Sequence, residues 1–89
     1  MTLEMMDDRI LVTPIEEREV GIIEPLWNKG VVEDTGPGPY VAGGHGRRSL
    51  TVSPGCTVLY EGRAGVWIQI DDMPRLVLRE ADIIAIVRE

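Results

Sequence analysis

The chain has 89 residues, enough for one domain and too few for two, so we expect residues 1–89 to fold as a single unit. It contains no Phe, two Trp and two Tyr, so its core must be built mainly from Ile, Val and Leu, of which Ile and Val favour strands. Nine Lys and Arg against fifteen Asp and Glu give a formal net charge of −6, which argues against a protein that neutralises nucleic-acid phosphates.

The first half of the chain alternates predicted strands with two long connections. Residues Arg9–Ile15 form a β-branched run that predicts the first strand. Residues 16–29 show neither strand nor helix periodicity and are interrupted by Gly and Pro, which predicts a long loop. Gly30–Thr35 predicts the second strand, and residues 36–48 are so dense in Gly and Pro that we expect a second excursion from the sheet.

The second half predicts short strands joined by turns. Residues 48–52 alternate polar and apolar side chains, and a Ser-Pro-Gly turn separates them from a strand at Thr57–Glu61. A Gly-containing turn leads to Val66–Ile70, an Asp-Asp-Met-Pro break precedes a short strand at Arg75–Arg79, and Ile83–Val87 forms the last strand. Many short strands and no amphipathic helix predict an all-β fold, a small barrel or sandwich.

The first and last predicted strands are apolar on both faces. In the first, Ile10 and Val12 face one side and Leu11 faces the other. In the last strand, the same alternation places Ile84 and Ile86 on one face and three residues on the other: Ile83, Ala85 and Val87. A small barrel has one inside, so the second apolar face indicates cover by a neighbouring subunit. The alternative is that both strands are central within one thicker core, and the pattern alone leaves both open.

Few residues are candidates for chemistry. His45 is the only histidine and has no second His or Cys at ligand spacing, so we expect no metal site. Asp71 and Asp72 border a Met-Pro turn and are expected in a solvated loop. The hydroxyl residues lack a neighbouring base in any recognisable motif: Ser49, Ser53 and Thr57. We therefore predict no catalytic residue, no cofactor and no enzymatic activity.

The setting of the protein also follows from the sequence. Cys56 is the only cysteine, which excludes an internal disulfide and predicts a buried structural thiol in a reducing compartment. The acidic first residues do not match a secretion signal, and no apolar run approaches the ~18 to 20 residues of a membrane span. We expect a cytoplasmic protein with no membrane partner.

Three motifs, in the right order, resemble the GroES (chaperonin-10) co-chaperonin family. Asp8–Val12 resembles the family's Asp-Arg-Val-Ile-Val opening, Val52–Val58 its Val-Lys-x-Gly-Asp-x-Val step, and Asp82–Val87 its Asp-Ile-Leu-Ala-Ile-Val ending. The opening and ending together are fairly specific, and the likeness covers nearly the whole chain. It implies an irregular small β-barrel with a mobile loop at residues 16–29 and a roof β-hairpin at residues 36–48, called below the docking loop and the roof excursion.

The resemblance also implies a function: a co-chaperonin that caps a GroEL-type chaperonin in its nucleotide-bound state and assists protein folding in the enclosed cavity. The nucleotide would be bound by the partner. The resemblance implies that Gly21, Ile22 and Ile23 contact the chaperonin, with Glu24 at the position where the family usually has an apolar residue and Pro25 after it. Either the register differs and Val20 or Leu26 joins the contact, or this loop is tuned to a particular chaperonin. The family's heptameric ring, in which the first strand pairs with the last strand of the next subunit, implies this interface: Arg9, Ile10, Leu11, Val12, Ile83, Ile84, Ala85, Ile86 and Val87.

Other interpretations stay open at this point. Ile22 and Ile23 would equally suit packing against the subunit's own barrel, and Trp27 would anchor the docking loop there. The roof excursion carries Gly-Gly-His-Gly-Arg-Arg in place of the family's common acidic turn, which fits a divergent or phage-encoded member. The rival functions are a stand-alone small β-barrel protein-binding module and a phage structural protein with no chaperonin partner.

Overall fold

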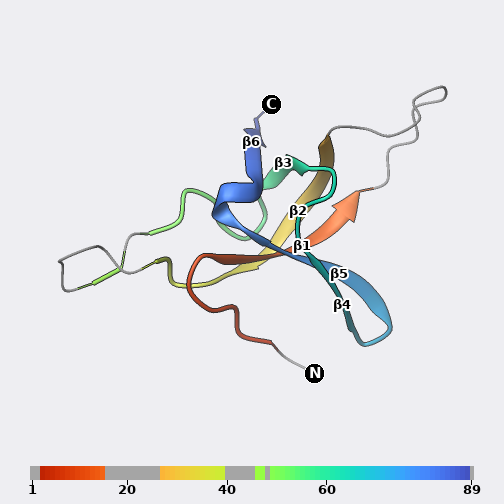
Figure 1. Ribbon diagram of the computed structural model, residues 1–89, viewed down its shortest axis with the longest axis horizontal. Helices are drawn as coiled ribbons and strands as arrows, with labels where there is room; N and C mark the ends of the chain where they lie inside the picture. The colour runs from red at the N-terminus through yellow and green to blue at the C-terminus, as the bar shows by residue number, and fades with distance from the viewer. Residues whose placement is uncertain (1–2, 16–26, 40–45, 48, 89) are drawn as a thin grey trace.

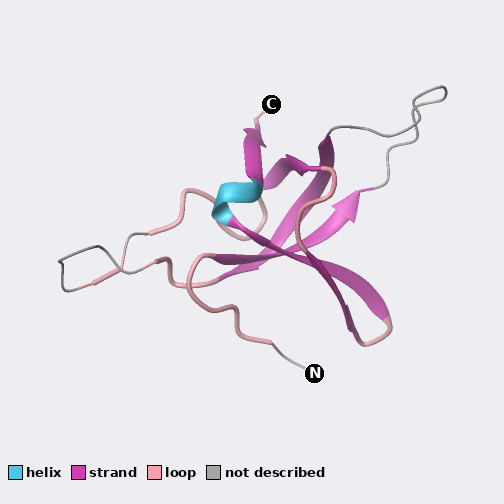
Figure 2. Cartoon of the chain, in the orientation of Figure 1, coloured by secondary structure: helices cyan, strands magenta, loops and turns pink. Residues whose placement is uncertain are grey.

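The computed structural model describes residues 3–15, 27–39, 46–47 and 49–88, which form one antiparallel sheet of six strands (Figures 1 and 2). In chain order these are β1 (Arg9–Ile15), β2 (Trp27–Thr35), β3 (Thr57–Glu61), β4 (Val66–Ile70), β5 (Met73–Arg79) and β6 (Ile83–Val87). Their order across the sheet is β4-β5-β1-β2-β3-β6, so β4 and β6 are its two edges. The predicted all-β fold is confirmed.

Helical structure in the described part of the chain is limited to one 3₁₀ turn, η1 (Glu80–Asp82), which leads into β6. No helix long and apolar enough to cross a membrane occurs among the described residues.

The sheet curls around one hydrophobic core to make a small, irregular β-barrel. Its buried members come mainly from alternate positions of the strands: Ile10, Val12, Val32, Val52, Val58, Tyr60, Leu76 and Leu78. β1 runs through the middle of this core, because β2 pairs along one side of it and β5 along the other. Burial raises the pKa of Tyr60, the one core residue of this set with a polar end.

Gly30 allows β1, β2 and β3 to pack closely at the centre of the barrel. It pairs with Pro14 on one side and Val58 on the other. A Cβ atom at this position would lie 2.3 Å from Cγ1 of Val12 and 3.3 Å from Cε1 of Tyr60. Both neighbours are core side chains, so the missing side chain leaves the space that they fill.

Four strands have the predicted bounds, and two begin earlier than predicted. β2 starts at Trp27 because residues Trp27–Lys29 pair with Leu59–Glu61 of β3, so these three residues belong to the sheet and not to the docking loop. β5 starts at Met73 because that residue and Pro74 pair with the end of β4. Pro74 is tolerated since β1 pairs with β5 only from Leu76 onward, which leaves one side of Pro74 without a strand.

The turns agree with their composition. Asp71 and Asp72 join β4 to β5 and both have positive φ, 50° and 66°, as a two-residue hairpin turn of type I′ requires. Of the alternating segment 48–52, the described residues 49–52 are not a strand, although Leu50 and Val52 pack on the core as their alternation indicates.

Candidate functional site

The docking loop connects two neighbouring strands of the sheet. β1 ends at Ile15 and β2 begins at Trp27, and Ile15 pairs with Lys29. The two ends from which the loop leaves the barrel are therefore side by side. The predicted chaperonin-binding residues all lie outside the described residues: Val20, Gly21, Ile22, Ile23 and Leu26.

Most of the first predicted interface segment lies inside the subunit. Ile10 and Val12 have no exposed surface and Leu11 is buried, whereas Arg9 is exposed. All four residues pair with β5, and Ile10, Leu11 and Val12 also pair with β2. The apolar faces of this strand left two interpretations open, a contact between subunits or a central place in the core. In the subunit the strand is central.

The second predicted interface segment lies at an edge of the sheet. β6 pairs with β3 alone, so its other backbone edge faces no strand of the described chain. Ile84 is 55% exposed and Ala85 is also exposed. An apolar side chain on a free strand edge is the kind of surface that pairs with another chain.

The predicted alternation in β6 is wrong in one respect. Ile83 and Ile86 both pack against the core, although the pattern sets them on opposite faces. The cause is an irregularity in the pairing with β3: Tyr60 pairs with Ile83 and Leu59 with Ala85, which leaves Ile84 as an extra residue. The bulge leaves Ile84 and Ala85 exposed and lets Ile83 and Ile86 both face the barrel.

A shallow hollow lies between the origin of the docking loop and the end of β6. It is lined by residues from both regions: Ile15, Lys29, Gly55, Cys56, Thr57, Ile86, Val87 and Arg88. Cys56 is half-buried there, not fully buried as predicted, and its Sγ lies 3.5 Å from Oγ of Ser53. The hydrogen bond with Ser53 holds the pKa of the Cys56 thiol below its usual value.

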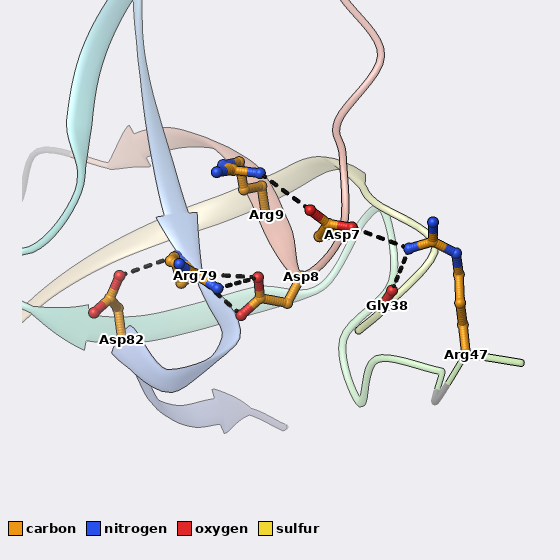
Figure 3. A network of polar contacts seen from close by, with 7 residues as sticks. All are labelled: Asp7, Asp8, Arg9, Gly38, Arg47, Arg79 and Asp82. Atoms are coloured by element: carbon orange, nitrogen blue, oxygen red, sulfur yellow. Dashed lines mark hydrogen bonds and ion pairs between the residues drawn. The ribbon is translucent and has the colours of Figure 1, made fainter. Parts of the chain in front are cut away.

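A network of polar contacts surrounds the turn that precedes β1, residues Met6–Arg9, called below the anchor turn (Figure 3). Oδ1 of Asp7 accepts a hydrogen bond from Nη1 of Arg47 at 3.1 Å, and Oδ1 of Asp8 lies 2.9 Å from Nη2 of Arg79. Burial raises the pKa of the Asp8 carboxyl, but the hydrogen bonds and the charge of Arg79 outweigh it and hold that pKa below its usual value. The sequence predicts none of these contacts, although Asp8 belongs to the motif that resembles the family's opening.

The hairpin β4–β5 carries a further exposed apolar surface that the sequence analysis did not single out. Val66 is 66% exposed, Trp67 is 60% exposed and Met73 is 54% exposed. Figure 1 shows this hairpin at the lower right, away from β3 and β6. The signal available in the sequence was that Val66 and Trp67 are adjacent, which makes both faces of this strand apolar.

No group of three or more His, Cys, Asp or Glu side chains arranged to hold a metal occurs among the described residues. His45 lies outside them. The described surface carries free strand edges, exposed apolar side chains and ion pairs, and the class that these features define is a small β-barrel protein with apolar strand edges.

Comparison with known proteins identifies the family. Residues 2–87 match the family described as the chaperonin 10 kDa subunit. The chain is 35% identical to the co-chaperonin GroES of Wolbachia sp. subsp. Drosophila simulans (strain wRi) over an alignment of 94 positions. The alignment covers 99% of this chain and 97% of that protein.

Two further relatives carry the same name. The co-chaperonin GroES of Borreliella burgdorferi is 34% identical over 88 residues, covering 98% of this chain and 97% of that protein. That of Nitratidesulfovibrio vulgaris is 37% identical over 95 residues, covering 98% and 99%. The chain belongs to the chaperonin 10 family, as its three motifs indicate.

Proposed function

We propose that this protein is a co-chaperonin that caps a GroEL-type chaperonin in its nucleotide-bound state and assists protein folding in the enclosed cavity. The observation that carries the proposal is the full-length match to relatives named co-chaperonin GroES, together with the small β-barrel that this chain forms. The relatives are named as co-chaperonins and not as enzymes. We place its action in the cytoplasm.

The docking loop is the proposed contact with the chaperonin. Its ends leave the barrel at Ile15 and Trp27, on two neighbouring paired strands, so we propose that the tip of the loop reaches a partner while the barrel stays fixed. Gly21 supplies backbone freedom, and Ile22 and Ile23 supply the apolar area. Because β2 begins at Trp27, eleven residues, 16–26, remain for this reach.

The contact of one loop is weak. Burial of two Ile side chains contributes roughly 3 to 6 kcal/mol gross, at about 1.5 to 3 each. Ordering each loop residue costs about 1 to 2 kcal/mol, so a few ordered residues offset most of that gain. Several loops on one ring bind together far more tightly, because each later contact is intramolecular. A modest change per site during the partner's nucleotide cycle then releases the whole cap.

The register of the contact differs from the usual family pattern. Glu24 occupies the third position of the tripeptide and Pro25 follows it, so a third apolar side chain must come from either side. Val20 and Leu26 are the candidates. We propose that at least one of them joins Ile22 and Ile23 in the chaperonin groove.

The proposed ring is a heptamer with a head-to-tail contact between the first and last strands. On the last-strand side, support comes from the free edge of β6 and the exposed side chains of Ile84 and Ala85. Ile83 and Ile86 pack on the core and hold that strand on the barrel. Val87 is the last residue of the strand.

On the first-strand side, the available edges limit how the contact forms. Residues Ile10–Val12 already have a strand on each side, so a partner strand has no backbone groups to bind there. Only Arg9 of this segment is exposed. Leu3–Met6, just before it, are in no strand, and Met6 is 56% exposed. We therefore propose that the seam extends from Arg9 toward the N-terminus, with Ile10, Leu11 and Val12 supporting it from inside the subunit.

The decisive test of function is chaperonin binding by variants of the docking loop. Ile22→Asp and Ile23→Asp should each abolish co-elution with a GroEL-type chaperonin in the presence of ADP, because a charge replaces the buried apolar contact. The native mass of both variants should equal that of the unmodified chain. Val66→Asp is the matched control: it adds the same charge at an exposed position on β4 and should bind normally.

Two outcomes would contradict the proposal. Unchanged co-elution of both loop variants would show that these isoleucines do not contact the chaperonin. Absence of binding by the unmodified chain, combined with a monomeric native mass, would favour a stand-alone protein-binding module or a structural protein.

A further inference from the structure

The anchor turn holds two parts of the chain that are distant in sequence. It is closed by a hydrogen bond from N of Arg9 to O of Met6 at 3.0 Å, and β1 follows it directly. Asp7, at its centre, has φ of +53°, a left-handed conformation that is uncommon for residues other than glycine. Such a conformation persists where the surrounding contacts hold it in place.

On one side the anchor turn holds the roof base, defined here as residues Gly36–Pro39 together with Gly46 and Arg47 (Figure 3). Nη1 of Arg47 donates to Oδ1 of Asp7 at 3.1 Å and to O of Gly38 at 2.9 Å. N of Gly38 donates to O of Asp7 at 2.8 Å, and N of Gly36 donates to O of Arg9 at 2.8 Å. One charged group and two backbone amides therefore depend on the position of this turn.

The packing on that side is close. A Cβ atom on Gly36 would lie 2.3 Å from O of Asp7 and 2.9 Å from O of Met6. The backbone of the roof base thus rests directly on the backbone of the anchor turn. A small displacement of the turn moves the acceptors of both glycine amides.

On the other side the anchor turn holds the entry to β6. The guanidinium of Arg79 contacts the carboxylate of Asp8 with Nη2 at 2.9 Å and Nε at 3.1 and 3.2 Å. N of Glu80, the first residue of η1, donates to O of Asp8 at 3.1 Å. Oδ2 of Asp82 accepts a hydrogen bond from N of Arg79 at 2.9 Å and closes the η1 turn, which leads into the edge strand β6. The side chain of Asp8 is only 14% exposed.

We propose that the anchor turn couples the roof base to the entry of β6, so that releasing the Asp8–Arg79 contact loosens the roof base. The two regions bind adjacent residues of one short turn, and Asp7 keeps its left-handed conformation because both sides hold it. Once one side is released, the turn relaxes and carries the carbonyl and carboxylate of Asp7 away from Gly38 and Arg47. This coupling lies within a single subunit and does not depend on the proposed chaperonin partner or on the ring.

A second hydrogen bond connects the entry of β6 with the chain that follows the roof excursion, and its effect must be distinguished from that of the anchor turn. Oε2 of Glu80 accepts a hydrogen bond from N of Thr51 at 3.1 Å, and Thr51 follows the roof excursion in the chain. Glu80→Ala removes that connection and leaves both aspartates of the anchor turn in place. The variant therefore distinguishes a signal that passes through the anchor turn from one that passes through Thr51.

The experiment is amide hydrogen exchange of the full chain, followed by NMR at Gly36, Gly38 and Glu80. Asp8→Asn keeps the shape of the side chain and removes its charge, and Arg79→Gln tests the same contact from the other partner. Both variants should raise exchange at Glu80 and also, by about tenfold, at Gly36 and Gly38, since a hydrogen bond to a charged group is lost. Arg75→Gln, on the same strand, removes an ion pair with Glu33 at 3.6 Å outside the anchor turn and should leave these amides unchanged.

Asp7→Gly gives the complementary result. Glycine adopts the positive φ freely but offers Arg47 no carboxylate, so Gly38 should exchange faster while Glu80 keeps its protection. The proposal is overturned if Asp8→Asn and Arg79→Gln raise exchange at Glu80 but leave Gly36 and Gly38 as in the unmodified chain. It is equally overturned if Glu80→Ala alone reproduces the loosening of the roof base.

Discussion

β1 and β6 have the same sequence character and opposite positions in the subunit. Both contain a short run of Ile, Leu, Val or Ala with apolar residues on both faces. β1 lies between β2 and β5, and its Ile10 is fully buried. β6 pairs with β3 alone, and its Ile84 is 55% exposed.

The difference shows that a strand can carry apolar residues on both faces for either of two physical reasons. In β1 the second face is covered by the subunit itself, so its residues stabilise the fold. In β6 one backbone edge and the side chains of Ile84 and Ala85 are free among the described residues, and the proposed role of this strand is assembly. The same substitution in the two strands should therefore change different properties.

The largest effect on the subunit is expected for Ile10→Ala. The change removes a fully buried side chain between Thr35 and Leu78 and should lower the free energy of unfolding by about 2 to 5 kcal/mol. Denaturant unfolding followed by circular dichroism measures it. A loss below about 1 kcal/mol would mean that β1 is not the central strand of the core.

Gly30→Ala tests the close packing beside β1. The added Cβ would meet Cγ1 of Val12 at 2.3 Å, so the core must shift, at a cost of about 1 to 3 kcal/mol. The same unfolding experiment applies, with Gly46→Ala as the control, because a Cβ there meets nothing within 4 Å. Equal stability of the two variants would show that β1 and β2 are further apart than described.

Acid should weaken the contact that joins the start of β1 to the entry of β6. The pKa of Asp8 is lowered in the folded chain, so the stability from its ionised form is present above the unfolded pKa of about 3.9 and is lost as pH falls through the lower, folded value. Thermal unfolding of the unmodified chain and of Asp8→Asn should differ at neutral pH and converge below about pH 4. A difference that stays constant down to pH 2 would exclude this carboxylate as the cause.

Ile84→Ala should have the smallest effect on the subunit. The side chain is more than half exposed, so the free energy of unfolding of the dissociated subunit should stay within about 0.5 kcal/mol of the original. Assembly should weaken, which makes apparent stability depend on protein concentration. A loss comparable to that of Ile10→Ala would place Ile84 in the core and erase the distinction between the strands.

Much of the fold was readable from local sequence, because each strand is short and bounded by turn residues. β1, β3, β4 and β6 have their predicted bounds. β2 and β5 begin early because pairing with a distant strand, and not local composition, decides their first residues: Trp27 pairs with Glu61, and Met73 with Ile70 across the Asp-Asp turn. Pairing also decides which β6 side chains face outward, since one extra residue opposite β3 reverses the alternation at Ile84.

The polar contacts of the anchor turn could not be predicted from the sequence, for a similar reason. Asp7 and Arg47 are 40 positions apart, and Asp8 and Arg79 are 71 apart, so no local pattern relates them. The docking-loop residues Ile22 and Ile23 came from resemblance to the family, and their contact remains a prediction that binding experiments must test.

Native mass spectrometry of the unmodified chain and of Ile84→Asp, at the same low concentration, tests most directly whether β6 is an assembly strand. We predict a heptamer for the unmodified chain and a folded monomer for the variant, with equal circular dichroism. A monomeric mass for the unmodified chain, or a stable heptamer that carries the aspartate, would contradict the account.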